Sequence, residues 1–320
     1  MNTILEEIGR IGIVPVVVLD DAEKAVPVAK ALRSGGINCA EVTFRTAAAE
    51  ASIKNITAAL PDMLAGAGTV LTTDQADRAV AAGAKFIVTP GYNPEVVEHC
   101  IARGIPVVPG CMDTHAIEMA LAAGLDTVKF FPAEAAGGLP MMKALAGPYV
   151  NLKFMPTGGI NADNLKEYLS FRKIVACGGS WMVKPALVRE ERYDEITRIT
   201  QEAVRRMLDF EVLHVGIHQE SEEEAVKAAG RFAALFGFQE KVSGGSVFAG
   251  SGIEVTGGKK APGACGHIAV GTGSLPRAVY YLGRQGAAFD MDSAEYRDGE
   301  LKAVYLKEEI GGFAIQLVQK

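Results

Sequence analysis

Several features that would assign the chain to a broad class of protein are missing from its sequence. The five cysteines are scattered without paired spacing, at Cys39, Cys100, Cys111, Cys177 and Cys265. Such a set is typical of free thiols in a reducing compartment. There is no run of about 18 apolar residues to span a bilayer, and residues 1–7 lack the basic-then-apolar layout of a signal peptide. We therefore expect a cytoplasmic protein.

A basic excess is missing too. Residues 1–209 carry 21 basic and 24 acidic side chains, and residues 210–320 carry 11 and 14, so each part has a net charge of −3. This balance argues against nucleic acid or an anionic membrane as a partner. Apolar residues, in contrast, make up 49% of the 320 positions, which is enough to fill the cores of two domains.

Residues 11–209 alternate short apolar runs with amphipathic helical runs. The apolar runs are continuous, as in strands of a parallel sheet that is covered on both faces. The eight predicted strands are residues 13–19, 39–43, 64–67, 86–89, 106–108, 127–131, 153–155 and 174–176. Eight such units predict an α/β fold, a (β/α)8 TIM barrel over residues 1–209. A doubly wound sheet is the alternative, but no Gly-x-Gly-x-x-Gly follows the first strand.

The pattern changes after Asp209. A strand at 210–217 and a helix at 222–236 precede short strands at 239–242, 247–249 and 253–256. A similar order recurs from His267, with a helix at 275–285 and strands at 299–306 and 314–318. We interpret residues 210–320 as a separate, smaller α+β module of two βαβββ-like repeats.

Two charged residues lie in or at the end of predicted buried strands. Burial disfavours an ammonium, so Lys129 is predicted to be a neutral amine nucleophile that forms a Schiff base. Glu41 is predicted to be its general acid–base, because burial favours proton uptake by a carboxylate. Two alternatives stay open: Glu41 could be an ion-pair partner of Arg45, and Lys129 could bind phosphate as an ammonium.

The carboxyl ends of barrel strands form the active site in this fold. Arg45 and Thr69 lie at two such ends and could hold a substrate carboxylate. Glycines near the seventh and eighth strands lie where these barrels commonly bind phosphate on backbone N–H groups. The predicted substrate-binding residues are Arg45, Thr69, Pro90, Phe131, Thr157, Gly158, Gly159, Gly179 and Ser180.

Eight short segments together resemble the 2-keto-3-deoxy-6-phosphogluconate (KDPG) / 4-hydroxy-2-oxoglutarate (KHG) aldolase family, a class I aldolase group. They are residues 14–16, 41–46, 66–70, 89–91, 109–110, 129–134, 156–160 and 178–181. The resemblance implies a homotrimeric barrel that needs no metal. Its Schiff-base lysine falls on Lys129, its acid–base carboxylate on Glu41, and its carboxylate-binding residues on Arg45 and Thr69. The small-molecule substrates would be KDPG, which gives pyruvate and glyceraldehyde 3-phosphate, and KHG, which gives pyruvate and glyoxylate.

The second part resembles a vicinal-oxygen-chelate (glyoxalase-like) module, through residues 212–215, 253–256, 266–270 and 315–317. That resemblance implies metal ligands at His214, Glu254, His267 and Gln316, a set that suits zinc or nickel. Gln316 replaces the usual carboxylate and is a poorer ligand. The alternative is that both histidines are hydrogen-bonded strand residues in a module kept for packing or binding.

Two other functions stay open. One is a sugar-acid-binding regulatory protein on an inactive barrel, although the presence of both Glu41 and Lys129 argues against a decayed site. The other is an independent metal-dependent lyase or dioxygenase activity in residues 210–320.

Overall fold

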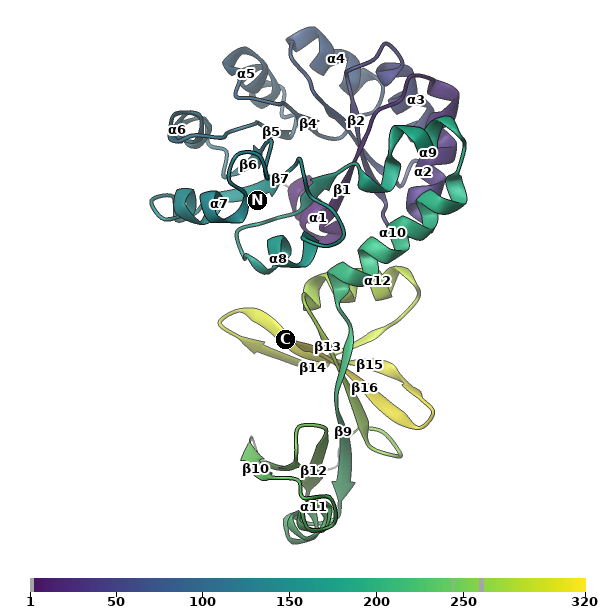
Figure 1. The fold of residues 1–320 in the computed structure, drawn as a ribbon, viewed down its shortest axis with the longest axis vertical. Helices are drawn as coiled ribbons and strands as arrows, with labels where there is room; N and C mark the ends of the chain where they lie inside the picture. The colour runs from purple at the N-terminus through teal and green to yellow at the C-terminus, as the bar shows by residue number, and fades with distance from the viewer. Residues whose placement is uncertain (1–2, 244, 259–261) are drawn as a thin grey trace. The chain divides into compact units, whose positions relative to one another are not determined.

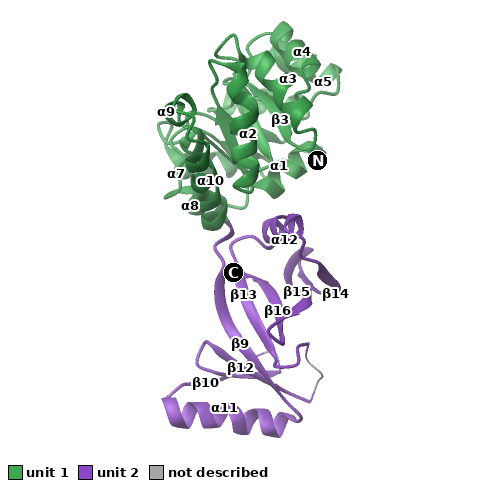
Figure 2. Cartoon of the chain, turned by 90° about the vertical axis from the view of Figure 1, so that its right-hand side faces the viewer, with its two compact units in different colours: residues 1–207 green, residues 208–320 purple. Residues whose placement is uncertain are grey.

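The chain forms two compact units in the computed structural model, which describes residues 3–243, 245–258 and 262–320. The division falls between Met207 and Leu208, two residues before the expected boundary (Figure 2). No helix in the described ranges is both long and apolar enough to cross a membrane.

Unit 1 consists of parallel strands surrounded by helices (Figure 1). Its strands are β1 (Ile13–Val17), β2 (Cys39–Thr43), β3 (Leu64–Gly68), β4 (Ile87–Val88), β5 (Val107–Val108), β6 (Thr127–Phe130), β7 (Lys153–Pro156) and β8 (Cys177–Gly179). Six of them form a sheet in the order β5-β4-β3-β2-β1-β8, and β6 pairs with β7. Parallel bridges from Gly110 to Lys129 and from Thr157 to Gly178 link the two sheets at both edges. The predicted α/β, barrel-like unit of parallel strands is confirmed.

The helices of unit 1 lie between successive strands. They are α1 (Thr3–Ile11), α2 (Ala25–Ser34), α3 (Ala49–Ala59), α4 (Thr73–Ala81), α5 (Pro94–Ala102), α6 (Thr114–Ala122), α7 (Gly138–Ala146), α8 (Leu165–Ser170), α9 (Pro185–Arg189) and α10 (Tyr193–Leu208). Side chains of Thr72, Asn93 and Asp113 accept hydrogen bonds from first-turn amides of α4, α5 and α6. These caps stabilise helix starts that face the carboxyl ends of the strands.

The core of unit 1 fills both sides of its strands. Every residue of β1, β2 and β3 is buried, which explains why their apolar runs are continuous rather than alternating.

The last strand of unit 1 lies three residues later than predicted. Residues 174–176 were expected to form it, but β8 is Cys177–Gly179 and pairs with β1 through Ile13, Val14 and Pro15. The expected position is wrong because two glycines indicated a loop, whereas here they belong to the strand. Glycine is tolerated in a strand where another chain segment approaches closely, and a Cβ at Gly178 would lie 2.2 Å from Oγ1 of Thr157.

Unit 2 is mostly one eight-stranded sheet. Its elements are β9 (Glu211–Gln219), α11 (Glu222–Phe236), β10 (Glu240–Ser243), β11 (Ser246–Ala249), β12 (Ile253–Gly257), β13 (His267–Thr272), α12 (Leu275–Arg284), β14 (Phe289–Arg297), β15 (Glu300–Ile310) and β16 (Phe313–Gln319). The strand order is β10-β11-β12-β9-β13-β16-β15-β14. Each half has the element order β-α-β-β-β, and the halves meet where β9 and β13 pair antiparallel.

One strand of unit 2 was not predicted. β14 lies at the sheet edge and pairs only with β15. Its residues include Asp290, Asp292 and Glu295, and none of its side chains is buried. An edge strand with acidic side chains lacks the apolar signal on which strand prediction depends.

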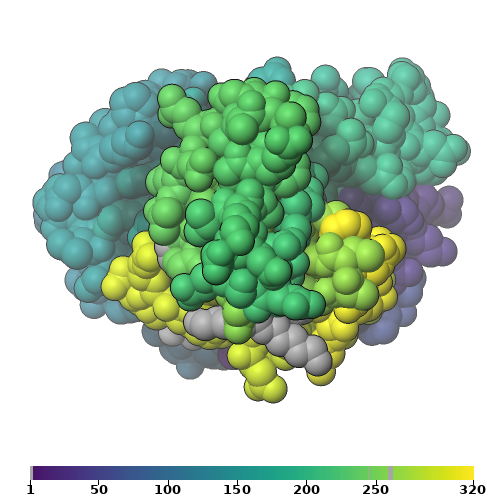
Figure 3. All heavy atoms as spheres, turned by 90° about the horizontal axis from the view of Figure 1, so that it is seen from below, coloured from purple at the N-terminus to yellow at the C-terminus, as the bar shows by residue number. Residues whose placement is uncertain are grey.

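Helix α11 packs on one face of the first half of the sheet. Ala225 and Ala229 of the helix form a core with Val247 and Val255 of the strands. The helix lies toward the viewer in Figure 3. Because side chains alternate along a strand, the neighbours of these core valines, Phe248 and Glu254, point to the opposite face.

Candidate functional site

A buried ion pair lies inside unit 1. Nζ of Lys129 on β6 is 3.1 Å from Oε1 of Glu41 on β2, and the two residues are 4% and 0% exposed. Two backbone hydrogen bonds hold Lys129 in place. Its N–H donates to the carbonyl of Pro109, and its carbonyl accepts from the N–H of Cys111. The two charges that the sequence singled out therefore meet, although 88 positions separate them. Glu41 pairs with Lys129, and not with Arg45, among the described residues.

One oxygen of the Glu41 carboxylate is not used in the contact with Lys129. Its Oε2 is buried and has no hydrogen-bond partner among the described residues. A buried polar atom without a partner costs free energy, so its presence indicates a place where a water or ligand binds. Close packing fixes this side chain, because a Cβ at Gly68 of the neighbouring strand would lie 2.1 Å from Oε1 of Glu41.

Arg45 and Thr69 also come together. Nε of Arg45 donates to Oγ1 of Thr69 over 3.3 Å. Thr69 has φ of +56°, a left-handed conformation that is unfavourable for a β-branched residue and costs about 1–3 kcal/mol. Such strain is concentrated at functional sites. The pair lies at the end of β2 and just beyond β3, at the edge where the Glu41 strand ends.

Phe131 and Pro90 line a cavity at the same ends of the strands. The cavity has a volume of about 370 Å³, and Tyr92, Asp113 and His115 contribute to its polar lining. The Phe131 ring centroid is 5.4 Å from Nζ of Lys129, so this ring connects the cavity with the buried pair. The sequence did not single out Asp113, the N-cap residue of α6, or His115, in the first turn of that helix.

The glycines after β7 adopt conformations that favour glycine. Gly158 and Gly159 have φ of +98° and +83°, and their loop contacts the segment after β6 through hydrogen bonds from Ala133 to Thr157 and from Glu134 to Gly158. The Thr157 hydroxyl is buried without a partner among the described residues. Gly179 ends β8 buried, while the next residue, Ser180, is exposed.

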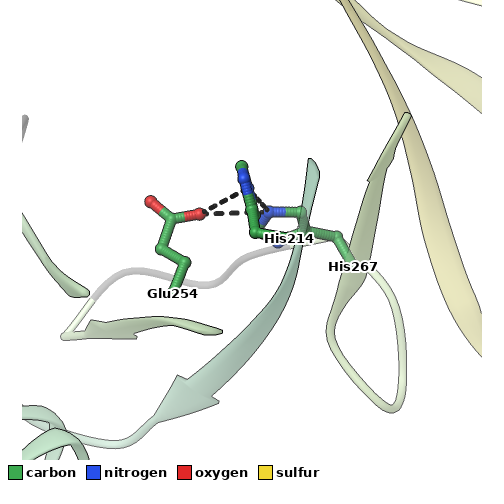
Figure 4. A group of neighbouring side chains, drawn as sticks. All are labelled: His214, Glu254 and His267. Carbon is green, nitrogen blue, oxygen red and sulfur yellow. Dashed lines mark hydrogen bonds and ion pairs between the residues drawn. The ribbon is translucent and has the colours of Figure 1, made fainter. Parts of the chain in front are cut away.

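A second cluster lies in unit 2. Figure 4 shows His214, Glu254 and His267 pointing toward one another. Oε2 of Glu254 is 3.1 Å from Nε2 of His214 and 3.2 Å from Nε2 of His267, and the two Nε2 atoms are 3.2 Å apart. Hydrogen bonds from His214 and then from His267 hold the pKa of Glu254 well below its usual range.

Strand register brings the cluster together. Glu254 on β12 lies opposite Gly216 on β9, and Gly216 lies opposite His267 on β13. A Cβ at Gly216 would lie 1.9 Å from Cε1 of His267, so only glycine leaves room for this ring. Sequence reasoning missed Gly216, although an isolated glycine inside a strand is a signal of close approach.

The fourth expected ligand, Gln316, lies on the same face by register. Ala269 of β13 is opposite both His214 and Gln316, and Gln316 is opposite Tyr305 of β15. The Tyr305 ring meets His267 edge-on at 6.0 Å, and burial, followed by the charge of Glu254, raises the pKa of Tyr305 to about 12.

The cluster fits a divalent transition metal. Three donor atoms, two imidazole nitrogens and one carboxylate oxygen, all lie within 4.8 Å of one another. With metal–ligand bonds of about 2.0–2.1 Å, adjacent donors are about 2.9–3.4 Å apart in octahedral or tetrahedral geometry. The observed separations of 3.1–3.2 Å fall in this range. Two histidines and one carboxylate are also a donor set that zinc and non-haem iron sites use.

Comparisons with known proteins concern mainly unit 1. The family model for KDPG and KHG aldolase matches residues 4–199. The 2-dehydro-3-deoxy-phosphogluconate aldolase of Treponema pallidum is 49% identical over 205 residues, which are 64% of this chain and 98% of that protein. The KHG/KDPG aldolase of Escherichia coli is 40% identical, and the aligned residues are 60% of this chain and 90% of that protein.

A solved structure agrees with these relatives. The KDPG aldolase of Legionella pneumophila, with pyruvate captured as a covalent carbinolamine intermediate, is 38% identical, with a TM-score of 0.61. The superposition covers 62% of this chain and 97% of the Legionella chain.

Proposed function

The chain belongs to the KDPG and KHG aldolase family, and on that basis we propose that Lys129 and Glu41 carry its chemistry. The protein is a class I aldolase, a lyase that acts through a Schiff base. The observation that carries the assignment of residues is the buried 3.1 Å contact between Nζ of Lys129 and Oε1 of Glu41. It joins an amine nucleophile to a proton acceptor away from water.

Lys129 first passes its ammonium proton to Glu41, and the resulting amine attacks the C2 ketone of a 2-keto-4-hydroxy acid to form a carbinolamine. Glu41 then returns this proton to the leaving hydroxyl, so water departs, an iminium forms and Glu41 is a carboxylate again. The iminium accepts the electron pair of the C3–C4 bond as that bond breaks. An aldehyde leaves, and an enamine of pyruvate remains on Lys129.

Glu41 moves protons during cleavage. Its Oε1 lies next to the amine, and its partnerless Oε2 is available to the C4 hydroxyl, directly or through a water. Glu41 takes the hydroxyl proton as the C3–C4 bond breaks and returns a proton to the enamine. Hydrolysis then releases pyruvate and restores the amine. General acid–base catalysis of this kind contributes about 10²–10⁴-fold to the rate.

The two ends of the substrate need separate anchors. Arg45 and Thr69 hold the keto-acid carboxylate, and the strained conformation of Thr69 positions its hydroxyl beside the guanidinium. The loop amides at Gly158, Gly159, Gly179 and Ser180 bind a phosphate, with the Thr157 hydroxyl close by. Phe131 and Pro90 border the space for the aldehyde half. Positioning of this kind lowers the barrier by several kcal/mol.

We further propose that residues 1–209 form a closed (β/α)8 barrel that acts as a homotrimer in the cytoplasm. KDPG and KHG are the expected substrates, because relatives carry both names. Steady-state kinetics with each acid measures the preference. Lys129→Ala should abolish pyruvate release from both, whereas Lys85→Ala, which removes an exposed lysine of the same unit, should leave it unchanged. Retained turnover in Lys129→Ala would refute the assignment.

A second function is supported by the cluster in unit 2. We propose that residues 210–320 are a vicinal-oxygen-chelate (glyoxalase-like) module of two βαβββ repeats in which His214, Glu254 and His267, with Gln316 on the same face, hold a zinc, nickel or similar divalent ion. When bound, the ion would supply Lewis acidity to an oxygen ligand. The matching element order of the two halves supports the module, and the 3.1–3.2 Å triangle of donor atoms supports the site.

Metal analysis of the full chain tests this second proposal. After loading and gel filtration, the protein should retain about one equivalent of metal, and His267→Ala should lose it. His115→Ala, a histidine of unit 1, is the matched control and should retain the metal. A metal-free wild-type chain would refute the proposal and favour histidines that only hydrogen-bond within the sheet.

A further inference from the structure

The sheet face that carries the His214, Glu254 and His267 cluster also carries the ammonium group of a lysine. Lys241 on β10 lies opposite Phe248 on β11, and Phe248 lies opposite Glu254 on β12. Residues opposite one another in a sheet point to the same face, so Lys241, Phe248, Glu254 and His267 form one row across the sheet. Lys241 is exposed and has no ion-pair partner among the described residues.

A cavity lies at the Lys241 end of this row. Its volume is about 460 Å³, and its lining consists of Gln239, Lys241, Ser243, Phe248, Gly250 and Ser251. The lining combines polar side chains with the aromatic ring of Phe248. That ring also meets His214 edge-on, with centroids 5.6 Å apart. The Phe248 side chain therefore lies between the cavity and the cluster and contacts both.

Helix α11 closes the other face of the same strands, because Val247 and Val255 pack against Ala225 and Ala229. Lys241 and the cluster are thus on the side of the sheet that the helix leaves open. Backbones two strands apart are separated by about 10 Å, and the side chains of Lys241 and Glu254 both project over that interval. A compact molecule with polar groups at both ends can contact both.

We propose that this face binds a 2-oxo acid with a second anionic group at its far end. The proposal rests on the metal site proposed above. Three protein donors, or four where Gln316 also binds, leave at least two positions open on a six-coordinate divalent ion, and adjacent carboxylate and ketone oxygens of a 2-oxo acid can fill both. The carbon chain lies along Phe248, and the distal anion pairs with the ammonium of Lys241.

The chemistry of the barrel favours this class of ligand. A Schiff-base aldolase of this family converts one 2-oxo acid into another, so such acids are available to the same polypeptide. A distal anion is also a feature of both proposed barrel substrates, which end in a phosphate or a second carboxylate. The module would then sense or transform molecules of the same chemical class as those that the barrel handles.

Cobalt substitution tests the ligand directly, since the absorption of bound Co²⁺ reports on its own coordination sphere and not on the barrel. The full chain is loaded with Co²⁺, freed of excess metal and titrated with 2-oxoglutarate, pyruvate and glutarate. The first has both a 2-oxo acid group and a distal carboxylate, and each of the others lacks one of these. We expect 2-oxoglutarate to shift the spectrum at a concentration about 10-fold lower than either of the others.

Lys241→Ala should weaken 2-oxoglutarate binding about 5- to 20-fold, without changing pyruvate binding or cobalt affinity. Lys227→Ala is the matched control, because Lys227 is an exposed lysine on α11, the helix of the opposite face. Equal effects of the two variants, or equal binding of the three acids, would overturn the proposal while leaving the metal site intact. Absence of any cobalt spectrum would instead overturn the metal site, and this proposal with it.

Discussion

Replacement of Glu41 by glutamine separates adduct formation from bond cleavage. The amide keeps the shape of the side chain and one oxygen that can accept a hydrogen bond from Nζ of Lys129, now 3.1 Å from Oε1. It cannot take up a proton from the C4 hydroxyl. Loss of general acid–base catalysis is worth about 10²–10⁴ in rate, which is about 2.7–5.4 kcal/mol in the activation barrier.

Pyruvate release, followed with lactate dehydrogenase, measures this loss as a fall in kcat on KDPG. Borohydride trapping of the variant with pyruvate should still yield part of the adduct, because pyruvate has no C3–C4 bond to cleave and only the proton transfers of adduct formation are slowed. Glu50→Gln is the matched control, since Glu50 is an exposed carboxylate paired with Arg78 on the outside of unit 1. A Glu41→Gln variant whose kcat stays within threefold of the wild type would refute the proton-transfer role.

Three further changes test other parts of the structure. Thr69→Gly should raise the free energy of unfolding by about 1 kcal/mol, because glycine relieves the strain at φ of +56°. The same variant should have a higher KM. A lower free energy of unfolding in denaturant titration would contradict this prediction. Gly216→Ala should weaken metal binding about 10-fold or more, because the added methyl group displaces the His267 ring. Calorimetry with Zn²⁺ measures the affinity. An unchanged affinity would show that Gly216 is not needed to position His267. Burial raises the pKa of the Cys100 thiol to about 11, so at pH 8 it stays protonated, and reactivity should increase only as the pH approaches that value. Cys265 is exposed, and Ellman's reagent should therefore titrate one thiol in the folded chain and five in denaturant.

The sequence was most informative about chemistry in unit 1. A lysine and a glutamate inside continuous apolar runs are unusual enough to be noticed one at a time. Their contact was not predictable from local pattern, since β2 and β6 are not neighbours in either sheet. It depends on the strands curving until side chains from distant strands meet, and this is a property of the whole set of strands.

Positions within strands were less predictable. The Gly178–Gly179 pair indicated a loop because glycine is unfavourable in a strand, but the packing of Thr157 against Gly178 requires its small size. β14 was missed because an edge strand buries little and its composition is polar.

The face of unit 2 shows a different limit. Lys241, Phe248, Glu254, Gly216 and His267 form a row only because the register across five strands aligns them. A shift of one residue in any pair would turn side chains to the other face. Local sequence gives alternation along a strand, but not which residues of separate strands stand side by side.

The most direct test of the account is to trap the intermediate. Wild-type protein is incubated with pyruvate, reduced with borohydride, digested and analysed by mass spectrometry. We expect one modified peptide, with the added mass on Lys129, and no modification in Lys129→Arg, which keeps the positive charge but lacks the amine nucleophile. An adduct on another lysine, or aldol cleavage by the wild type without any adduct, would contradict the central claim.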